Sequence, residues 1–527
     1  MPSPDNFKRF IPDLVLVTAA LGMTALYVFS AGGGFPLDDA WIHQTYGRNL
    51  AETGLWSFVP GVVSAASTSP MYTIVLAIGY KLGVPFPLWT HGLGALALAG
   101  TAVIARQMAI QIAPKLRGIG LATGIAMIFS WHLLWAAASG METALFSLMT
   151  IVCIAQVWRE LNAARSSRAI HISLRGGVFG ILAAVTTLVR PEGILLIAII
   201  GLFLLIARPN MRWRDVILWG AASLASFMVL LIPYLLFNLD VTGGLLPTTA
   251  AAKQIYAVPI RALGYFWGFR LMIIPLLAGG QVLLIPGMIV YVVVVLKRLK
   301  HKRTALLFLL PPVWGAALIA LYGGWLPLNF QHGRYVIPAL PALIFAGVVG
   351  TGWLLKMAQR PMFARVLVRA LALGAALLMV VFAFGPGLSS YQLDVRVINE
   401  EMVAPARWIA ENLPPEEMLA IHDIGAVGYF APRPMLDIAG LVSPEFIEMI
   451  ANPEGQWELM QRGDAHYFMA FPDQIPGGAA GDFRLCPIYQ SDGNATLIAG
   501  GQKMIVYYLA WDGACPQRVG VGTDAES

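Results

Sequence analysis

Two adjacent carboxylates, Asp38 and Asp39, follow the first long apolar segment of this 527-residue chain. Acids beside a membrane-length segment are costly to place, so a pair of them there predicts a function. The pair could serve as a general base that activates a hydroxyl group, or could bind a divalent cation such as Mg²⁺ or Mn²⁺. One aspartate could instead cap the helix expected to follow, but capping accounts for only one of the two. We therefore predict chemistry at this pair without choosing between its members.

Basic residues in the other loops on the same side of the membrane form a second candidate set. Lysine and arginine are disfavoured in external loops, so those found there need an explanation. An anionic ligand, phosphate above all, is one; a snorkelling side chain or an ion pair with Asp38 or Glu142 is another. The residues predicted to bind substrate are Lys253, Arg334, His332, Arg190, Glu142, His43 and Arg48. Near the C-terminus, turns after strands explain His422, Asp423 and Asp437 better than ligand contact does.

The composition limits the class of protein. Hydrophobic residues make up 58% of the chain and charged residues 12%. A soluble protein of this composition would expose large apolar patches, so we predict a polytopic α-helical membrane protein surrounded by membrane lipids. The net charge of +6 comes from short basic clusters between apolar runs rather than from one patch. That distribution is typical of cytoplasmic loops and argues against a nucleic-acid partner.

Apolar segments long enough to span a bilayer begin near residues 11, 85, 117, 140, 174, 191, 215, 270, 303, 334 and 366. The basic clusters all fall on one side only if residues 69–106 make one net crossing, so we predict a juxtamembrane or re-entrant helix at Thr68–Leu82. This arrangement gives about 11 to 13 spanning helices, a cytoplasmic N-terminus and an external C-terminus. The clusters assigned to the cytoplasm are Lys8/Arg9, Arg106/Lys115/Arg117, Arg159/Arg165/Arg168/Arg175, Arg208/Arg212/Arg214, Lys297–Arg303 and Lys356–Arg369.

A change of composition near Gly387 divides the chain. We predict a membrane domain at residues 1–387, with an external loop at 32–69, and an external domain at residues 388–527. Short apolar runs alternate with helix-like runs in the second part, which indicates a small α/β domain. Cys486 and Cys515 lie there, and a disulfide would suit an oxidising compartment, but the sequence leaves their pairing open. Cys153 lies in an apolar helix and is expected to pack there.

Short motifs recur in a characteristic order along the chain. They are Asp38-Asp-Ala-Trp-Ile-His43 with Tyr46 and Arg48-Asn-Leu-Ala51, Ser67-Thr-Ser-Pro-Met-Tyr72, Ser139-Gly-Met-Glu142, Leu188-Val-Arg-Pro-Glu-Gly193, Leu246-Pro-Thr-Thr249 with Lys253, Arg334-Tyr335 and Asp423-Ile-Gly-Ala-Val-Gly-Tyr-Phe430. Together they resemble the GT-C superfamily of integral-membrane glycosyltransferases. The resemblance is closest to the bacterial branch that includes mycobacterial arabinofuranosyltransferases, and more distant to protein mannosyltransferases and lipid A aminoarabinose transferases.

The resemblance implies a GT-C membrane domain that moves a sugar from a polyprenyl-phosphate-linked donor to an acceptor hydroxyl. Transfer would occur on the external face of the inner (cytoplasmic) membrane, in assembly of a cell-envelope glycan or glycoconjugate with a glycan, lipid or protein acceptor. By the same resemblance, the base is Asp38 or Asp39, and Lys253 and Arg334 hold the lipid phosphate. The residues expected to line the pocket are Arg190, His332 and Glu142. One motif departs from the family, since Leu246-Pro-Thr-Thr249 stands where Leu-Pro-Asn-Thr is expected, which leaves that loop's contact open.

Physical chemistry is consistent with this reaction. A base opposite the leaving phosphate gives a single displacement, which inverts the anomeric centre. Phosphate paired with lysine or arginine leaves readily, so a metal ion is not required; if a divalent cation binds, Asp38 and Asp39 are its predicted ligands.

Two other classes of function share part of the pattern. A lipid or polysaccharide transporter would have similar spans and a basic groove, but would not need two adjacent acids at the groove, and transporters often contain internal repeats that this sequence lacks. A non-catalytic receptor or assembly subunit would leave the external acids and bases unexplained.

Overall fold

The computed structural model describes residues 4–161, 168–207, 212–359, 361–478 and 482–515. Arg165, Arg208 and Arg360, three members of the predicted cytoplasmic clusters, lie outside these ranges, as do residues 479–481 and 516–527 of the predicted external domain. Within them, eight helical stretches are long and apolar enough to cross a membrane, and ten if each of two bent pairs counts as one span. The predicted polytopic helical class is therefore confirmed.

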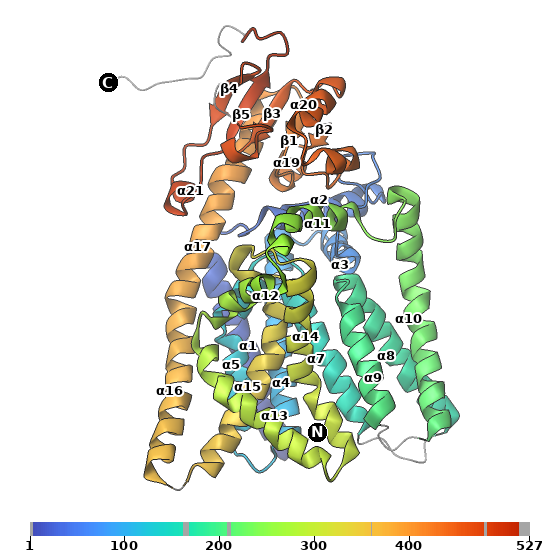
Figure 1. The fold of residues 1–527 in the computed structure, drawn as a ribbon, viewed down its shortest axis with the longest axis vertical. Coiled ribbons are helices and arrows are strands. Elements are labelled where there is room, and N and C mark those ends of the chain that lie inside the picture. The colour runs from blue at the N-terminus through green and yellow to red at the C-terminus, as the bar shows by residue number, and fades with distance from the viewer. Residues whose placement is uncertain (1–3, 162–167, 208–211, 360, 479–481, 516–527) are drawn as a thin grey trace.

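The spanning helices form an elongated bundle with the C-terminal domain at one end (Figure 1). Most begin where the apolar segments predicted them. The long apolar helices are α1 (Pro4–Ser30), α4 (Phe86–Ile112), α8 (Ala169–Val189), α10 (Trp213–Thr242), α13 (Ile285–Leu299), α14 (Leu310–Trp325), α15 (Leu340–Met357) and α16 (Met362–Phe384). The bundle also contains the bent pair α5 (Ile119–Ile128) and α6 (Trp131–Ala138), with α7 (Thr143–Glu160) and α9 (Gly193–Ala207).

The segment expected to begin a span near residue 270 is broken instead. The helices α11 (Thr248–Ala262) and α12 (Tyr265–Ile273) meet at 111°, and the spanning helix starts only near Gly280. Pro275 lacks the amide that a continuing helix needs, and Gly279 has a positive φ of 131°. Hydropathy alone continues the apolar segment through these two residues, but Pro275 and Gly279 interrupt the helix.

Two short helices lie across the end of the bundle, beneath the C-terminal domain (Figure 1). The first, α2 (Asp38–Thr53), ends at Gly54, which has a left-handed φ of 75°. The second, α3 (Pro70–Lys81), has 12 residues and rises about 18 Å at 1.5 Å per residue, which is too short to cross the roughly 30 Å core of a bilayer. This agrees with the expectation that Thr68–Leu82 makes no full crossing.

The C-terminal domain is carried on a nearly continuous helical column. It runs from α16 through α17 (Pro386–Ile398) and a π-helical turn (Asn399–Val403) into α18 (Ala404–Asn412) (Figure 1). The five-stranded sheet beyond it has the order β2-β1-β3-β5-β4, parallel among its first three strands and antiparallel among the rest. Its strands are β1 (Leu419–Ile421), β2 (Met435–Asp437), β3 (Tyr467–Ala470), β4 (Leu485–Gln490) and β5 (Ile505–Leu509).

Helical segments fill the connections between these strands. Between β1 and β2 lies α19 (Gly425–Phe430), while the 3₁₀-helix Pro444–Met449 and α20 (Pro453–Arg462) separate β2 from β3. A four-residue helix, α21 (Ala495–Ile498), follows β4.

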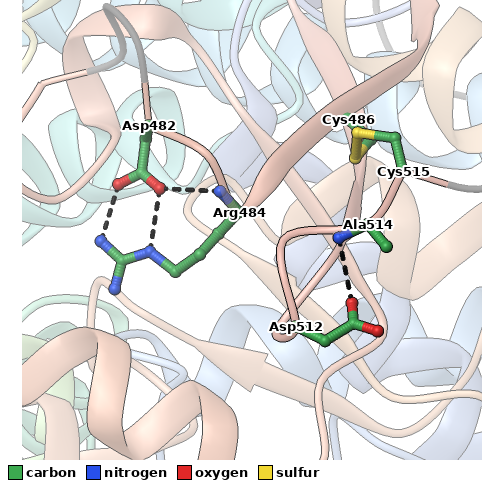
Figure 2. Close-up of a disulfide and its surroundings, with 6 residues drawn as sticks. All are labelled: Asp482, Arg484, Cys486, Asp512, Ala514 and Cys515. Atoms are coloured by element: carbon green, nitrogen blue, oxygen red, sulfur yellow. Dashed lines mark hydrogen bonds and ion pairs between the residues drawn. A yellow bond between two sulfur atoms is a disulfide. The ribbon is translucent and has the colours of Figure 1, made fainter.

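A disulfide closes the edge of this sheet. Cys486 of β4 is bonded to Cys515, which lies just beyond β5, over a separation of 29 residues (Figure 2). A loop of that size stabilises the folded domain by about 3–4 kcal/mol in the chain-entropy view. Beside it, Arg484 makes a two-pronged ion pair with Asp482 (Figure 2). The pairing that the sequence left open is thus made, and Cys153 is buried in α7 as expected.

Candidate active site

The two adjacent aspartates occupy the first two positions of α2 and face different partners. Leu37 is the N-cap residue, and no side chain caps the helix, so capping explains neither acid. Their carboxylates favour a helix N-terminus in any case, because the helix dipole is positive there. Asp38 turns toward the C-terminal domain and Asp39 toward a cavity, and this divergence separates their roles.

Asp38 joins the membrane domain to α19. Its Oδ2 accepts a hydrogen bond from the amide of Gly425 at 2.6 Å, and its Oδ1 accepts one from the amide of Ala426 at 2.8 Å. The first amides of a helix have no partner inside it, so this carboxylate satisfies two of them. A Cβ on residue 425 would lie 2.1 Å from the backbone oxygen of Asp38, so the close approach requires glycine. Burial, reinforced by Asp423, raises the pKa of Asp38 to about 7.

Arg48 holds the opposite end of α19. It donates hydrogen bonds to the backbone oxygens of Tyr429 at 2.7 Å and Gly428 at 3.2 Å, and its guanidinium lies 4.7 Å from the centre of the Tyr429 ring. The last carbonyls of a helix carry partial negative charge, so a cation there is favourable. Asp38 and Arg48 therefore bind opposite ends of α19. We call these two residues together with α19 the docking clamp. Arg48, predicted to bind substrate, is thereby engaged with the C-terminal domain.

Asp39 projects into a cavity between α2 and the bundle. Its Oδ2 lies 2.6 Å from Nη2 of Arg334 and 3.8 Å from Nζ of Lys253. Burial alone would raise its pKa, but these two cations outweigh burial and hold the pKa of Asp39 below its ordinary value. Asp39 is thus a carboxylate whose basicity is suppressed by two groups suited to binding phosphate.

The cavity brings together residues from distant parts of the chain. Its charged lining consists of three acids and three bases: Asp39, Glu142, Glu192, Arg190, Lys253 and Arg334. Five of the seven residues predicted to bind substrate line it: Lys253, Arg334, Arg190, Glu142 and His43. Leu441 of the C-terminal domain also lines the cavity. Both regions of the protein therefore contribute to one cavity that contains six charged side chains.

One wall of the cavity is a connected network around Glu142. His43, four residues after Asp39 and so on the same face of α2, places Nε2 3.4 Å from Glu142, while Arg190 lies 3.3 Å from the other carboxylate oxygen. Burial would raise the pKa of Glu142, but the His43 hydrogen bond and Arg190 hold it below its ordinary value. Arg190 also donates to Glu192 and, at 2.8 Å, to Tyr322. This network is largely self-neutralised and fixes the shape of the wall.

His332 lies outside the cavity lining. Its Nε2 and the Nε1 of Trp135 each lie 2.8 Å from the same oxygen of Asp394, on α17. Gln331 and His332 have positive φ angles of 29° and 57°, which non-glycine residues rarely adopt. Arg334 follows directly. The side chain predicted to bind substrate therefore anchors a strained turn that positions Arg334.

The loop that departs from the family's motif attaches α11 to the chain near α3. The backbone amide of Thr248 donates to the backbone oxygen of Ala65, the Thr248 hydroxyl donates to that of Leu441, and the Thr249 hydroxyl donates to that of Ala66. The two hydroxyl groups thus fix α11, and Lys253 with it, against the cavity.

Sequence reasoning overlooked Tyr335 as a site residue. Its ring lies 5.1 Å from the Arg334 guanidinium and 5.6 Å from the Lys253 ammonium, and it stacks on Tyr322. Aromatic faces attract cations, so Tyr335 holds both cations in place. The adjacency of Arg334 and Tyr335 was visible in the sequence, but the approach of Lys253 was not.

Of the other candidate polar residues of the C-terminal domain, His422 places its Nε2 3.5 Å from the Tyr256 hydroxyl of α11, while Asp423 and Asp437 make contacts within the domain. The Asp437 carboxylate accepts hydrogen bonds from the amides of Ala439, Leu441 and Val442, which shapes the loop that brings Leu441 to the cavity. Asp423 accepts a hydrogen bond from Gln474 and lies 3.4 Å from His422. The turn interpretation thus describes the contacts of Asp437.

The acidic pair does not fit a divalent cation. Both oxygens of Asp38 already accept backbone amides, and Asp39 faces two cationic side chains. Among the described residues, no group of three or more histidine, cysteine, aspartate or glutamate side chains is arranged to hold a metal ion.

Solved structures share this architecture over nearly the whole chain. The apo structure of ArnT from Cupriavidus metallidurans covers 96% of this chain and 99% of its own, with a TM-score of 0.59 and 14% identity. The same protein bound to undecaprenyl phosphate gives a TM-score of 0.56 at 15% identity. The structure of the Archaeoglobus fulgidus oligosaccharyltransferase tethered with an acceptor peptide covers 96% of this chain and 75% of its own. Its TM-score is 0.61 and its sequence identity is 11%. The chain has the GT-C glycosyltransferase fold.

Sequence comparison adds a narrower match. Residues 387–507 match the model of a domain of unknown function, DUF8728. The matched stretch contains α18, α19, strands β1 to β4, most of α17 and the first part of β5. No curated protein matches the chain in sequence. The GT-C fold is therefore established by structure, and the chemistry of the cavity must carry the functional argument.

Proposed function

We propose that the protein is an inverting glycosyltransferase that moves a sugar from a polyprenyl-phosphate-linked donor to an acceptor hydroxyl. The observation that carries this proposal is the position of Asp39, which lies in the cavity between two cations that can bind phosphate. The Asp39 carboxylate adjoins the two cations proposed to bind phosphate, and a base beside a phosphate site suits a reaction in which a phosphate leaves as a hydroxyl attacks. The GT-C fold, shared with ArnT bound to undecaprenyl phosphate, supports the same donor class.

The lipid phosphate is proposed to bind Arg334 and Lys253. The Arg334 side chain is 8% exposed, and its Nε and Nη1 have no hydrogen-bond partner among the described residues. Buried arginine donors without acceptors are costly, and phosphate oxygens accept such donors well. Lys253 is 22% exposed and supplies a second, more mobile charge. The two cations would also stabilise the negative charge that grows on the leaving phosphate.

Donor binding would activate Asp39. The donor phosphate competes with Asp39 for Arg334 and Lys253, so the pKa of Asp39 rises toward its ordinary value when the donor binds. Asp39 then takes the proton of the acceptor hydroxyl as its oxygen bonds to the anomeric carbon. The bond from that carbon to the phosphate oxygen breaks, and the polyprenyl phosphate leaves with the electron pair. Because the base is suppressed until the donor arrives, proton abstraction is confined to the loaded site.

The remaining cavity residues are proposed to position the sugar. Glu142, Arg190 and His43 form a rigid wall, and the Nδ1 of His43 is buried without a partner among the described residues, so it can accept or donate one hydrogen bond to a sugar hydroxyl. No step is assigned to a metal ion. Asp38 is proposed to act through the docking clamp, by fixing the C-terminal domain over the cavity.

The domain arrangement and the disulfide support a proposal for the compartment. We propose that the protein is a multi-pass protein of the inner membrane, with residues 1–387 as its membrane domain and residues 388–527 on the external side. The Cys486–Cys515 disulfide supports this orientation, because disulfides persist in oxidising compartments. The acceptor, a glycan, lipid or protein, would then reach the cavity from outside during assembly of a cell-envelope glycan or glycoconjugate.

A lipid transporter or flippase is the second candidate. One observation favours it: a cavity lined mainly by apolar side chains of α12 to α15 would accept a lipid chain. A glycosyltransferase needs the same feature for the chain of its donor, so this cavity does not separate the two functions. Asp39 between two cations is the feature that a transporter does not require.

Purified protein in lipid nanodiscs, given radiolabelled sugars on a panel of polyprenyl phosphates and a cell-envelope extract as acceptor, tests the proposal. We expect wild type to move label from one donor to the acceptor fraction, and Arg334→Gln to lose this activity. Arg462→Gln, which removes an exposed arginine from α20, is the matched control and should retain it. Donor binding without consumption by wild type, with active extract present, would favour the transporter.

A further inference from the structure

A second cavity with basic side chains lies at the opposite end of the bundle, away from the C-terminal domain. It lies between the loop after α4 and the last turns of α13 and α15. Three basic residues line it, one from each segment: Lys115, Arg298 and Lys356. Its remaining lining is apolar apart from the peptide groups: Ile112, Ala113, Pro114, Leu116, Val294, Trp353 and Met357.

These cations have no acidic counterpart. Among the described residues that line the cavity, none carries a carboxylate, and none of the three cations forms an ion pair with a described residue. Other arginines at this end of the bundle are paired: Arg106 lies 2.9 Å from Asp13, and Arg175 lies 3.6 Å from Glu160. Three like charges around one cavity repel each other, so an anion between them would be stabilised.

The geometry of Arg298 makes this more than a patch of exposed lysines. Its Nη1 donates to the backbone oxygen of Ile112 at 3.3 Å, and its guanidinium lies 4.8 Å from the centre of the Trp353 ring. These contacts hold the arginine in a fixed position and leave its other N–H groups available. Trp353 is also consistent with a site at the membrane–water interface, because tryptophan is enriched there.

We propose that this cavity binds the phosphate headgroup of an anionic phospholipid from the leaflet on that side. The three cations suit a phosphate diester, and the apolar wall formed by Ile112, Leu116 and Val294 suits the first part of the acyl chains. A soluble phosphate would use the charges but not that wall. The general excess of basic residues in cytoplasmic loops explains isolated lysines, but not the convergence of three from separate segments on one cavity. The inference does not depend on transferase activity.

The test compares two double variants that remove the same charge. Lys115→Gln with Lys356→Gln removes two cavity cations and keeps the packing of Arg298. Lys297→Gln with Lys300→Gln, at exposed positions near the end of α13 that do not line the cavity, is the matched control. Full-length protein is titrated with phosphatidylglycerol in phosphatidylcholine nanodiscs, bound lipid is counted by native mass spectrometry, and thermal unfolding confirms that each variant is folded.

We expect phosphatidylglycerol to bind the cavity variant about 30-fold more weakly than wild type, since each basic residue near an anionic headgroup contributes roughly fivefold. The control should bind within about twofold of wild type. An equal loss in both variants would show diffuse attraction to the surface and would overturn the site, as would no loss in the folded cavity variant. Displacement of the lipid by inorganic phosphate at the same headgroup concentration would assign the cavity to a soluble anion and overturn the lipid proposal.

Discussion

The docking clamp makes a specific prediction about Asp38. Replacing Asp38 with asparagine keeps the shape of the side chain but exchanges one acceptor oxygen for an NH₂ group. Both carboxylate oxygens now accept amides, from Gly425 and Ala426. In the variant, one of these buried amides would lose its acceptor and face another donor. The substitution should therefore loosen α19 while leaving the cavity residues in place.

The size of the effect follows from the two hydrogen bonds. Leaving one buried amide without an acceptor costs about 1–3 kcal/mol, and a central value of about 2 kcal/mol corresponds to a roughly 30-fold increase in the population of the opened α19. The Arg48 end of α19 retains its contacts, so we expect local opening rather than unfolding of the whole C-terminal domain.

Hydrogen–deuterium exchange of the peptides that cover residues 425–430 measures this opening directly. We expect exchange in Asp38→Asn to be about 30-fold faster than in wild type. Asp39→Asn is a closely matched control, because it makes the same chemical change at the neighbouring position, and exchange of α19 should stay at the wild-type rate. Unchanged protection in Asp38→Asn, or equal loosening in both variants, would refute the clamp.

Three further outcomes are expected. Burial raises the pKa of Asp38 to about 7, so the folded state binds a proton that the unfolded state has released; the resulting stabilisation is complete below about pH 4 and is lost as the pH rises through 7. Denaturation curves from pH 5 to 8 should show this slope in wild type, and Asp38→Asn should flatten it. In Arg334→Gln, donor affinity should fall about tenfold or more, because a charged hydrogen-bond partner of the phosphate is lost, and the pKa of Asp39 should rise; isothermal titration with the donor and infrared titration of the carboxylates measure these two changes. Equal donor affinity in both proteins would contradict the phosphate site. Removing the disulfide with Cys486→Ala should lower the unfolding free energy of the C-terminal domain by about 3 kcal/mol, as measured by chemical denaturation, and an unchanged midpoint would show that the bond contributes no stability.

The sequence was a sound guide to the helical class because burial in a bilayer imposes long apolar segments. Most of the long apolar helices begin near the predicted positions. The stretch near residue 270 failed because Pro275 and Gly279 break a helix that hydropathy alone would continue. Local breakers decide where an apolar segment becomes a span.

The sequence predicted most of the residues that line the candidate site, but it did not predict the different contacts of Asp38 and Asp39. The cavity brings Asp39 together with Lys253 and Arg334, about 200 and 300 residues further along the chain, as their predicted placement on one side of the membrane had indicated. No sequence pattern could show that Asp38 turns toward Gly425 while Asp39 turns toward Arg334. That difference depends on how the C-terminal domain packs on α2. The same packing places the Arg48 side chain against α19, where it donates to the backbone oxygen of Tyr429. The contact of His332 with Asp394 on α17 keeps the His332 side chain outside the cavity lining.

A single-turnover experiment on Asp39→Asn tests the central claim most directly. The donor is first bound to the protein, its affinity is measured, and acceptor is then added to follow the rate of sugar transfer. Our account predicts that the variant binds donor at least as tightly as wild type, because no carboxylate competes for Arg334 and Lys253, while transfer slows by about a thousandfold. Transfer at the wild-type rate, or loss of donor binding with the chemistry intact, would contradict Asp39 as the base.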